Sequence, residues 1–188
     1  MRLGGAVLLS VPEASPFLQD LTAADVDLAD PLHLRAIVGE PREQRGPAAL
    51  FFFDPLGRGR LDMAVTEILP TSDPAIAELI GTCDPSAASE SSLQDVESDL
   101  SVLRSGAEVV AASGWTAWGG VVAHLGVLSH PGHRRKGLAR RVSADATRRA
   151  IDAGMVPQWR AREGNDASVA LASSLGFELL GRQLTFRM

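Results

Sequence analysis

Residues 121–149 read VVAHLGVLSHPGHRRKGLARRVSADATRR, and this stretch decides the fold. Its first half is apolar and contains β-branched residues, which predicts a largely buried strand. Its second half has helical spacing, with Leu138, Val142 and Ala146 apolar at i, i+4 and i+8. The turn between them, residues 130–139, contains glycines and three consecutive cations: Arg134, Arg135 and Lys136. Because a helix start also offers unpaired amides and a positive dipole, this turn predicts a diphosphate site.

The composition indicates one soluble globular domain over residues 1–188. Its hydrophobic fraction of 45% and charged fraction of 22% are those of ordinary globular proteins, and no apolar run approaches the roughly 20 residues that span a bilayer. The start of the sequence lacks the features of a secretory signal, and the lone Cys83 excludes an internal disulfide framework. We therefore expect a cytoplasmic protein without a membrane partner.

The net charge of −5 is unevenly distributed. Residues 1–104 hold 17 acidic and 7 basic residues, whereas residues 105–188 hold 6 and 11. A basic second half suits an anionic ligand, and an acidic first half suits a cationic or amine-bearing one if both line the same cleft; otherwise both are solvated surface. Basic helices without aromatic interleaving, in an acidic chain, argue against a nucleic-acid partner.

The second half has the pattern β-β-β-α-β-α-β. We expect strands and helices, in order, at 100–104, 108–113, 121–129, 138–154, 156–161, 165–175 and 177–187, with the first two strands paired antiparallel and the last segment forming one strand or a pair. In the first half we expect a short strand or a buried segment at 4–11, two short helices within 20–38, a hairpin of 47–53 with 61–69, a helix at 74–81 and a loop at 83–92.

Two separated motifs carry a resemblance to a known family. The first is Arg134-Arg135-Lys136-Gly137-Leu138-Ala139, which fits the pattern Gln/Arg-x-x-Gly-x-Gly/Ala after a strand. The second fits Asn-x-x-Ala/Ser-x-x-Leu…Gly-Phe, with Asn165, Ser168, Leu171, Gly176 and Phe177. With both in strand-to-helix context, the chain from about Glu90 to Met188 resembles the GCN5-related N-acetyltransferases (GNAT), which use acetyl-CoA to acetylate amines.

The resemblance implies an α/β (α+β) fold. Such a fold has a mixed, mostly antiparallel sheet whose central strands splay apart, flanked by helices. Within one domain, residues 1–89 would form a variable N-terminal part on the acceptor side, and residues 90–188 the acetyl-CoA-binding core.

The resemblance also assigns residues to the cosubstrate. The amides of residues 134–139 would hold the CoA diphosphate, the edge of Val127-Leu128 would bind pantetheine, and an amide of the Val127 strand would stabilise the oxyanion. Asn165 and Ser168 would hold the far end of pantetheine or the departing thiol. The implied cosubstrate-binding residues are Val127, Leu128, Arg134, Arg135, Lys136, Gly137, Leu138, Ala139, Asn165 and Ser168. No metal is expected, since no pair of histidines has ligand spacing.

Three residues are catalytic candidates: His124, Glu90 and Ser168. The ordinary pKa of His124 suits a general base, but the residue also fits a hydrogen-bonded histidine of the sheet. Glu90 either reaches the amine from the preceding loop or is an exposed carboxylate. Many family members carry a tyrosine where this chain has Ala172, and the sequence contains no tyrosine. Ser168 or water would protonate the thiolate instead, or the thiolate would leave unprotonated.

These observations predict an acetyl-CoA-dependent N-acetyltransferase that acts on a primary amine of a small molecule or peptide by direct attack. A covalent route is disfavoured because no serine or cysteine has an activating neighbour. The alternative is a non-catalytic acyl-CoA-binding sensor of the same fold, as a monomer or homodimer in either case. Three tryptophans either line the acceptor pocket or are buried in the sheet: Trp115, Trp118 and Trp159.

Overall fold

The computed structural model describes residues 2–3, 6–7, 20, 30–61 and 65–187. They belong to two compact units. One takes residues 1–50, 161–166 and 179–188, and the other takes residues 51–160 and 167–178. The larger unit contains the stretch that decides the fold. A single domain with an acceptor part at 1–89 and a cosubstrate-binding core at 90–188 stays a prediction. The boundaries of the two compact units do not fall between residues 89 and 90.

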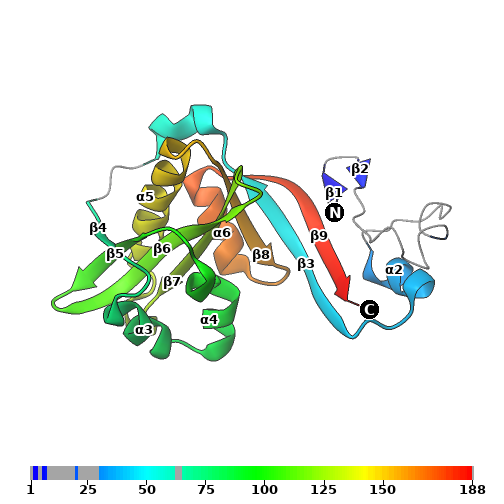
Figure 1. Cartoon of the computed structure of the whole chain (residues 1–188), viewed down its shortest axis with the longest axis horizontal. Coiled ribbons are helices and arrows are strands. Elements are labelled where there is room, and N and C mark those ends of the chain that lie inside the picture. Colours follow the sequence, from blue (N-terminus) through cyan, green and yellow to red (C-terminus); the bar gives the residue numbers. More distant parts are fainter. Residues whose placement is uncertain (1, 4–5, 8–19, 21–29, 62–64, 188) are drawn as a thin grey trace. The chain divides into compact units, whose positions relative to one another are not determined.

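The larger unit is built on a mixed, mostly antiparallel sheet, as predicted (Figure 1). Its strands are β4 (Glu67–Leu69), β5 (Leu100–Ser105), β6 (Glu108–Trp118), β7 (Val122–Ser129) and β8 (Val156–Arg162). They lie in the order β8-β7-β6-β5-β4. Only the β7–β8 pair is parallel, and the other neighbours pair antiparallel. The helix between β7 and β8 makes the crossover that a parallel pair requires.

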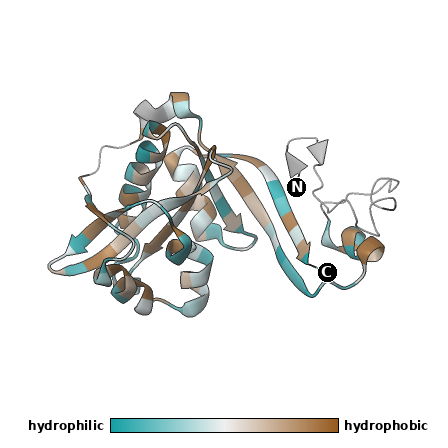
Figure 2. Cartoon of the chain, in the orientation of Figure 1, coloured by the Kyte–Doolittle hydropathy of each residue, from teal (hydrophilic) through white to brown (hydrophobic). Residues whose placement is uncertain are grey.

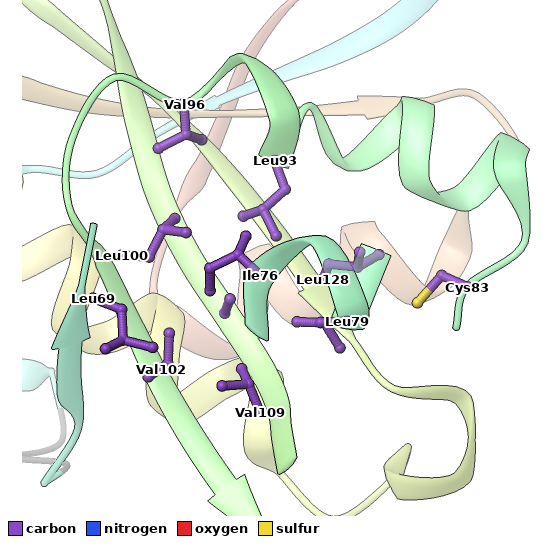
Figure 3. Packing of buried hydrophobic residues seen from close by; sticks show 11 residues of the cluster. Leu69, Ile76, Leu79, Cys83, Leu93, Val96, Leu100, Val102, Val109 and Leu128 are labelled. Atoms are coloured by element: carbon purple, nitrogen blue, oxygen red, sulfur yellow. The ribbon is translucent and has the colours of Figure 1, made fainter. Parts of the chain in front are cut away.

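Helices cover both faces of this sheet. The first face carries α3 (Pro74–Gly81), α4 (Pro85–Ser91) and the short 3-10 helix η2 (Leu93–Asp95). There Ile76 and Leu79 of α3 pack into one cluster with Leu128 of β7 (Figure 3). The second face carries α5 (Leu138–Asp152) and α6 (Asp166–Leu175). Residues alternate between the faces along each strand, so the register of the strands decides which side chains share a site.

Helix α5 confirms the predicted spacing. Val142 and Ala146 are fully buried against the sheet, and Leu138 at the start of the helix is half-buried. Figure 2 shows hydrophilic and hydrophobic residues in alternating bands along this helix. The apolar stripe therefore fixes α5, and with it the turn that precedes it, against the strands.

Two helix starts share one capping arrangement. Asp73 accepts a hydrogen bond from the Ala75 amide at 2.9 Å, and Pro74 begins α3, which confirms the predicted helix. Asp84 accepts from the Ser86 amide at 2.8 Å, and a proline again begins the helix, α4. The predicted loop over 83–92 is therefore wrong, because the second Asp-Pro pair starts a helix as the first does.

The predicted hairpin of 47–53 with 61–69 is also wrong. Residues 55–60 form a 3-10 helix, η1 (Pro55–Arg60), and β4 pairs antiparallel with β5, where Leu69 lies opposite Leu100. Leu69 joins the buried cluster of the first face. Burial against a distant strand therefore decided the pairing of β4.

The smaller unit contains β1 (Arg2–Leu3), β2 (Ala6–Val7), α2 (Pro31–Val38), β3 (Glu43–Phe52) and β9 (Glu178–Arg187). β1 pairs antiparallel with both β2 and β9. Helix α2 confirms the second of the short helices expected in 20–38, and the Asp30 carboxylate caps it at 2.8 Å from the Leu32 amide. Residues 4–5, 8–11 and 21–29 of the expected strand and first short helix lie outside the described residues.

Candidate functional site

The parallel strands β7 and β8 separate in the middle of the larger unit's sheet. Their pairing runs from Val122 opposite Val156 to His124 opposite Gln158, and ends there. Both strands continue, β7 to Ser129 and β8 to Arg162. The splay predicted for the central strands is therefore present, and it begins directly after the pair His124–Gln158.

The hydrogen-bond pattern shows which main-chain groups of β7 face the splay. The amide of His130 donates to the Val110 carbonyl of β6 at 2.9 Å, and the Val121 carbonyl accepts from the Val156 amide at 2.9 Å. Because bonding direction alternates along a strand, odd-numbered residues turn their amide and carbonyl away from β6. Val127 thus presents its main chain on the side where β8 has left. The main-chain groups of Leu128, the other expected pantetheine contact, point toward β6.

The turn after β7 is held by His130. This residue begins a 3-10 helix, η3 (Pro131–His133), and its Nδ1 accepts from the Gly132 amide at 3.0 Å. Its Nε2 lies 3.3 Å from a carboxylate oxygen of Glu108 on β6. The ring of His133 packs edge-on against it, with 5.3 Å between the ring centroids. His130 therefore acts as an anchor that fixes the start of the turn.

The rest of the turn contains two left-handed residues and a run of amides without a main-chain acceptor among the described residues. Arg135 and Gly137 adopt left-handed conformations, with φ of 61° and 73°. In the described part of the chain, the amides of residues 135–139 donate to no main-chain carbonyl, whereas the Arg141 amide closes the first turn of α5 on the Gly137 carbonyl at 3.1 Å. Successive free amides next to left-handed residues form a concave anion site, and the helix dipole adds to it. The side chains of residues 134–136 are exposed and add three positive charges.

His124 lies on β7 with only 9% of its surface exposed. Its Nδ1 is 3.1 Å from Oε1 of Gln158, and its ring stacks on Trp118 with 4.2 Å between centroids and 15° between planes. The pKa of His124 lies below its ordinary value of 6.5, chiefly because burial disfavours the charged ring and also because of the Arg160 charge, while the Gln158 hydrogen bond opposes the shift. The ring is therefore neutral at pH 7.

Glu90 lies in the last turn of α4 and is half-buried, so it does not lie on a loop. Helix α4 packs against β7 on the face that also carries His124. Gly126 makes this approach possible, since a Cβ at that position would lie 2.7 Å from the Ser91 carbonyl oxygen. The structure thus brings the end of α4 to the strand that bears His124, on the same face.

Ser168 lies on the opposite face of the sheet. Its Oγ accepts a hydrogen bond of 2.9 Å from Nε1 of Trp159, a β8 residue that points away from the face of Gln158. His124 and Ser168 are therefore not neighbours on one surface. Asn165 belongs to the smaller unit, and its amide donates to the Arg162 carbonyl at 3.0 Å in the turn before α6.

The remaining residues of the second motif are structural. Phe177 packs edge-on against Phe53 and Trp159, with centroid distances of 5.3 and 5.8 Å. Its amide donates to the carbonyl of Ala172, and Ala172 has no exposed surface. Ala172, for which the resemblance implies a tyrosine, is thus a buried methyl group, which offers no proton.

The three tryptophans separate by face. Trp115 and Trp159 are buried, at 8% and 2% exposure, and the guanidinium of Arg149 on α5 lies 5.3 Å from the centroid of the Trp115 ring. Trp118 is 40% exposed and lies on the face of His124. Of the three, only Trp118 remains a candidate for the acceptor side.

The sequence did not predict Gln158 as a site residue, because only the register of two distant strands places it beside His124.

The described residues contain no group of three or more His, Cys, Asp or Glu side chains placed to hold a metal ion. None of the described helices combines the length and the apolar character needed to cross a membrane.

Comparison with known proteins finds a family match for part of the chain. Residues 101–183 match the sequence model of the GNAT acetyltransferases. No curated protein sequence matches the chain.

Several solved structures resemble the chain in fold. A GNAT-family protein from Novosphingobium aromaticivorans shares 19% identity and a TM-score of 0.60, over 79% of this chain and 68% of that one. A GNAT-family acetyltransferase from Colwellia psychrerythraea shares 16% identity and a TM-score of 0.61, over 82% and 61%. A GCN5-related N-acetyltransferase from Kribbella flavida shares 19% identity and a TM-score of 0.54, over 81% and 62%. The chain thus spans less than two thirds of the length of the last two structures.

Proposed function

We propose that this protein, whose residues 101–183 belong to the GNAT acetyltransferase family, transfers the acetyl group of acetyl-CoA to a primary amine of a small molecule or peptide. One observation carries the proposal. A single strand, β7, ends in a turn that has exposed cations and amides without a main-chain acceptor among the described residues, and it separates from β8 directly after the buried, neutral His124. A proton acceptor, an open main-chain edge and phosphate-binding groups therefore follow one another along residues 124–139.

The proposed assignments at the cosubstrate end follow from this order. The amides of residues 135–139 and the cations of residues 134–136 bind the diphosphate, and the open main-chain edge at Val127 bonds the pantetheine arm. That edge leads the thioester to the point where the two strands part, next to His124. Ser168 keeps its proposed role of contacting the far end of pantetheine or the departing thiol, and the same role for Asn165 stays what the resemblance implies.

The chemistry is a direct attack. The neutral amine nitrogen bonds to the thioester carbonyl carbon, a β7 amide donates to the developing oxyanion, and His124 takes the proton that the nitrogen loses. The carbon–sulfur bond then breaks and CoA leaves as thiolate, which takes a proton from water or from Ser168. Direct attack on the thioester requires no acyl-enzyme and hence no activated serine or cysteine. Glu90 on the same face would orient the incoming amine.

Thiol release from acetyl-CoA tests the proposal. The full chain is assayed against small amines, amino acids, polyamines and peptides, beside Gly137→Glu, which places a carboxylate in the amide turn. Gly154→Glu is the matched control, because both glycines have left-handed φ (73° and 77°) and open space around them. Gly154 follows the far end of α5, roughly 22 Å along a 15-residue helix. We expect amine-dependent release that Gly137→Glu abolishes and Gly154→Glu spares. Equal loss in both variants, or release independent of any amine, contradicts the proposal.

A second candidate function has one observation in its favour. Ala172 is buried where many relatives carry an acidic hydroxyl, so the chain would suit a non-catalytic acyl-CoA sensor. Acetyl-CoA binding measured by calorimetry, without thiol release on any acceptor, identifies the sensor. Turnover on any amine excludes it.

A further inference from the structure

His124 and Gln158 are opposed across the only parallel strand pair of the larger unit's described strands. They are the last residues in register before β7 and β8 separate. Side chains of residues in register lie on the same face, and both are largely withdrawn from solvent, with 9% and 6% exposed. Nδ1 of the imidazole faces Oε1 of the carboxamide at 3.1 Å. Two buried polar groups are thus each other's partner at the point where the strands part.

The chemistry of this contact decides where the imidazole proton lies. A carboxamide oxygen only accepts hydrogen bonds, so the Nδ1 that faces it must carry the proton. A neutral imidazole has a single N–H, which leaves the lone pair on Nε2. We infer that Gln158 is a positioning residue that fixes His124 in the Nδ1–H tautomer, so that Nε2 is the atom that accepts the proton of the attacking amine. The catalytic part of this inference rests on the proposed function, whereas the tautomer does not.

Trp118 completes the arrangement by holding the plane of the ring. The indole lies almost parallel to the imidazole, at 15° and 4.2 Å, and so opposes rotation of the ring about its Cβ–Cγ bond. The hydrogen bond to Gln158 fixes which nitrogen faces β8, and the stack keeps it there. Trp118 and Gln158 together restrict the orientation and the protonation site of His124.

The charges near His124 set the direction of its titration. Arg160 lies on the neighbouring strand β8, and the helices that cover this face carry Glu90 on α4 and Asp95 on η2. Of these, Arg160 disfavours the protonated ring, as burial does, and both lower the pKa of His124. Gln158 opposes them by accepting from the ring. Replacing its carboxamide by a carboxylate therefore favours the imidazolium and raises the pKa of His124.

The first test reads the tautomer directly. Nitrogen-15 NMR of the full-length protein at pH 8 distinguishes protonated from unprotonated ring nitrogens, and the chain has four histidines. The spectrum of His124→Asn assigns the His124 signals by their loss. We expect Nδ1 protonated and Nε2 unprotonated in the wild type, and a mixture of tautomers in Gln158→Met. A wild type with the proton on Nε2 overturns the inference, whether or not the protein turns over any substrate.

The second test reads the pH profile of kcat/KM. Gln158→Met lowers kcat about tenfold, the effect of losing roughly one hydrogen bond, with the KM for acetyl-CoA unchanged, and it moves the acid limb to lower pH. Gln158→Glu moves the acid limb to higher pH by about one unit. Gln94→Glu is the charge-matched control, since this residue is exposed on η2, and it leaves the limb in place. A merely structural Gln158 would lower kcat without moving either limb, which contradicts the inference.

The two tests separate this inference from the proposed function. An absence of thiol release by the wild type on every amine defeats the proposed function, while the NMR result still decides the tautomer. Release with an unshifted acid limb in both Gln158 variants defeats the positioning role and leaves acetyl transfer intact.

Discussion

The imidazole of His124 and the carboxamide of Gln158, 3.1 Å apart, occupy the last in-register position of β7 and β8. The residue that terminates the pairing on one strand is therefore bonded to the residue that terminates it on the other. A proton acceptor held at the end of a ladder keeps a fixed position relative to the main-chain groups that follow, such as those of Val127. Single substitutions in and around the site should therefore have distinct effects on activity, on stability and on acetyl-CoA binding.

We expect His124→Asn to lower kcat by about 10²-fold or more, the ordinary contribution of a general base. Because the pKa of His124 lies below 6.5, the wild-type rate, expressed per neutral amine, should be level above pH 7 and fall as the pH drops below that pKa. The variant should lose this acid limb. The measurement is kcat/KM from pH 5 to 9, with exposed His33→Asn as the control. An acid limb that survives in His124→Asn assigns the titration to another group.

Gly126→Ala should destabilise the protein by about 1–3 kcal/mol, because the added methyl carbon would lie 2.7 Å from the Ser91 carbonyl and push the end of α4 off β7. Urea unfolding measures the free energy. Gly81→Ala is the control, because that glycine has open space around it and closes a helix, so alanine there is neutral or slightly stabilising. Equal free energies of unfolding for the two variants would show that α4 can move away from β7 without destabilising the protein.

Ser168→Ala should leave the buried indole N–H of Trp159 without its acceptor and cost about 1–3 kcal/mol. The double variant Trp159→Phe/Ser168→Ala removes both partners, so its destabilisation should be smaller than the sum of the two single changes. A double-mutant cycle by thermal or urea unfolding measures this coupling. Additive effects would mean that the 2.9 Å contact does not contribute to stability. A kcat loss above tenfold in Ser168→Ala alone would instead support its role as the acid.

Replacing Arg134, Arg135 and Lys136 together by alanine should raise the KM for acetyl-CoA at least about tenfold at low salt, with little change in kcat, because exposed cations bind rather than react. The difference from wild type should shrink as ionic strength rises and screens the exposed charges. Initial rates at 0.02 and 0.5 M NaCl check both parts. Arg45→Ala removes an exposed arginine paired with Glu43 and serves as the control. A KM that is unchanged at low salt would place the diphosphate elsewhere.

The sequence predicted the central part of this fold because its signals are local. The apolar run at Val121, the helical spacing of Leu138, Val142 and Ala146, and the turn between them each depend on neighbours in the chain. The start of α3 at Asp73-Pro74 was predicted for the same reason. Asp84-Pro85 gives the same signal for α4. The serines and alanines that follow are also typical of loops, so a loop was predicted there.

Features that depend on distant partners were not predictable. The strand β4 was expected beside 47–53, its nearest apolar segment, yet it pairs with β5 some thirty residues further on. The partner of His124 also comes from 34 residues away, and only the register of two parallel strands brings Gln158 to it. The sequence therefore predicted His124 as the candidate base, but only the structure shows which residues contact it.

The separation of the tryptophans by face has a practical consequence for spectroscopy. With Trp115 and Trp159 buried on the other side of the sheet, Trp118 is the indole in contact with the ring of His124. An imidazolium withdraws electrons from an excited indole, so the fluorescence of this protein should dim as His124 gains its proton. The same emission should respond when a molecule covers the outer face of Trp118. The chain thus carries an intrinsic optical reporter at the place where its acceptor is proposed to bind.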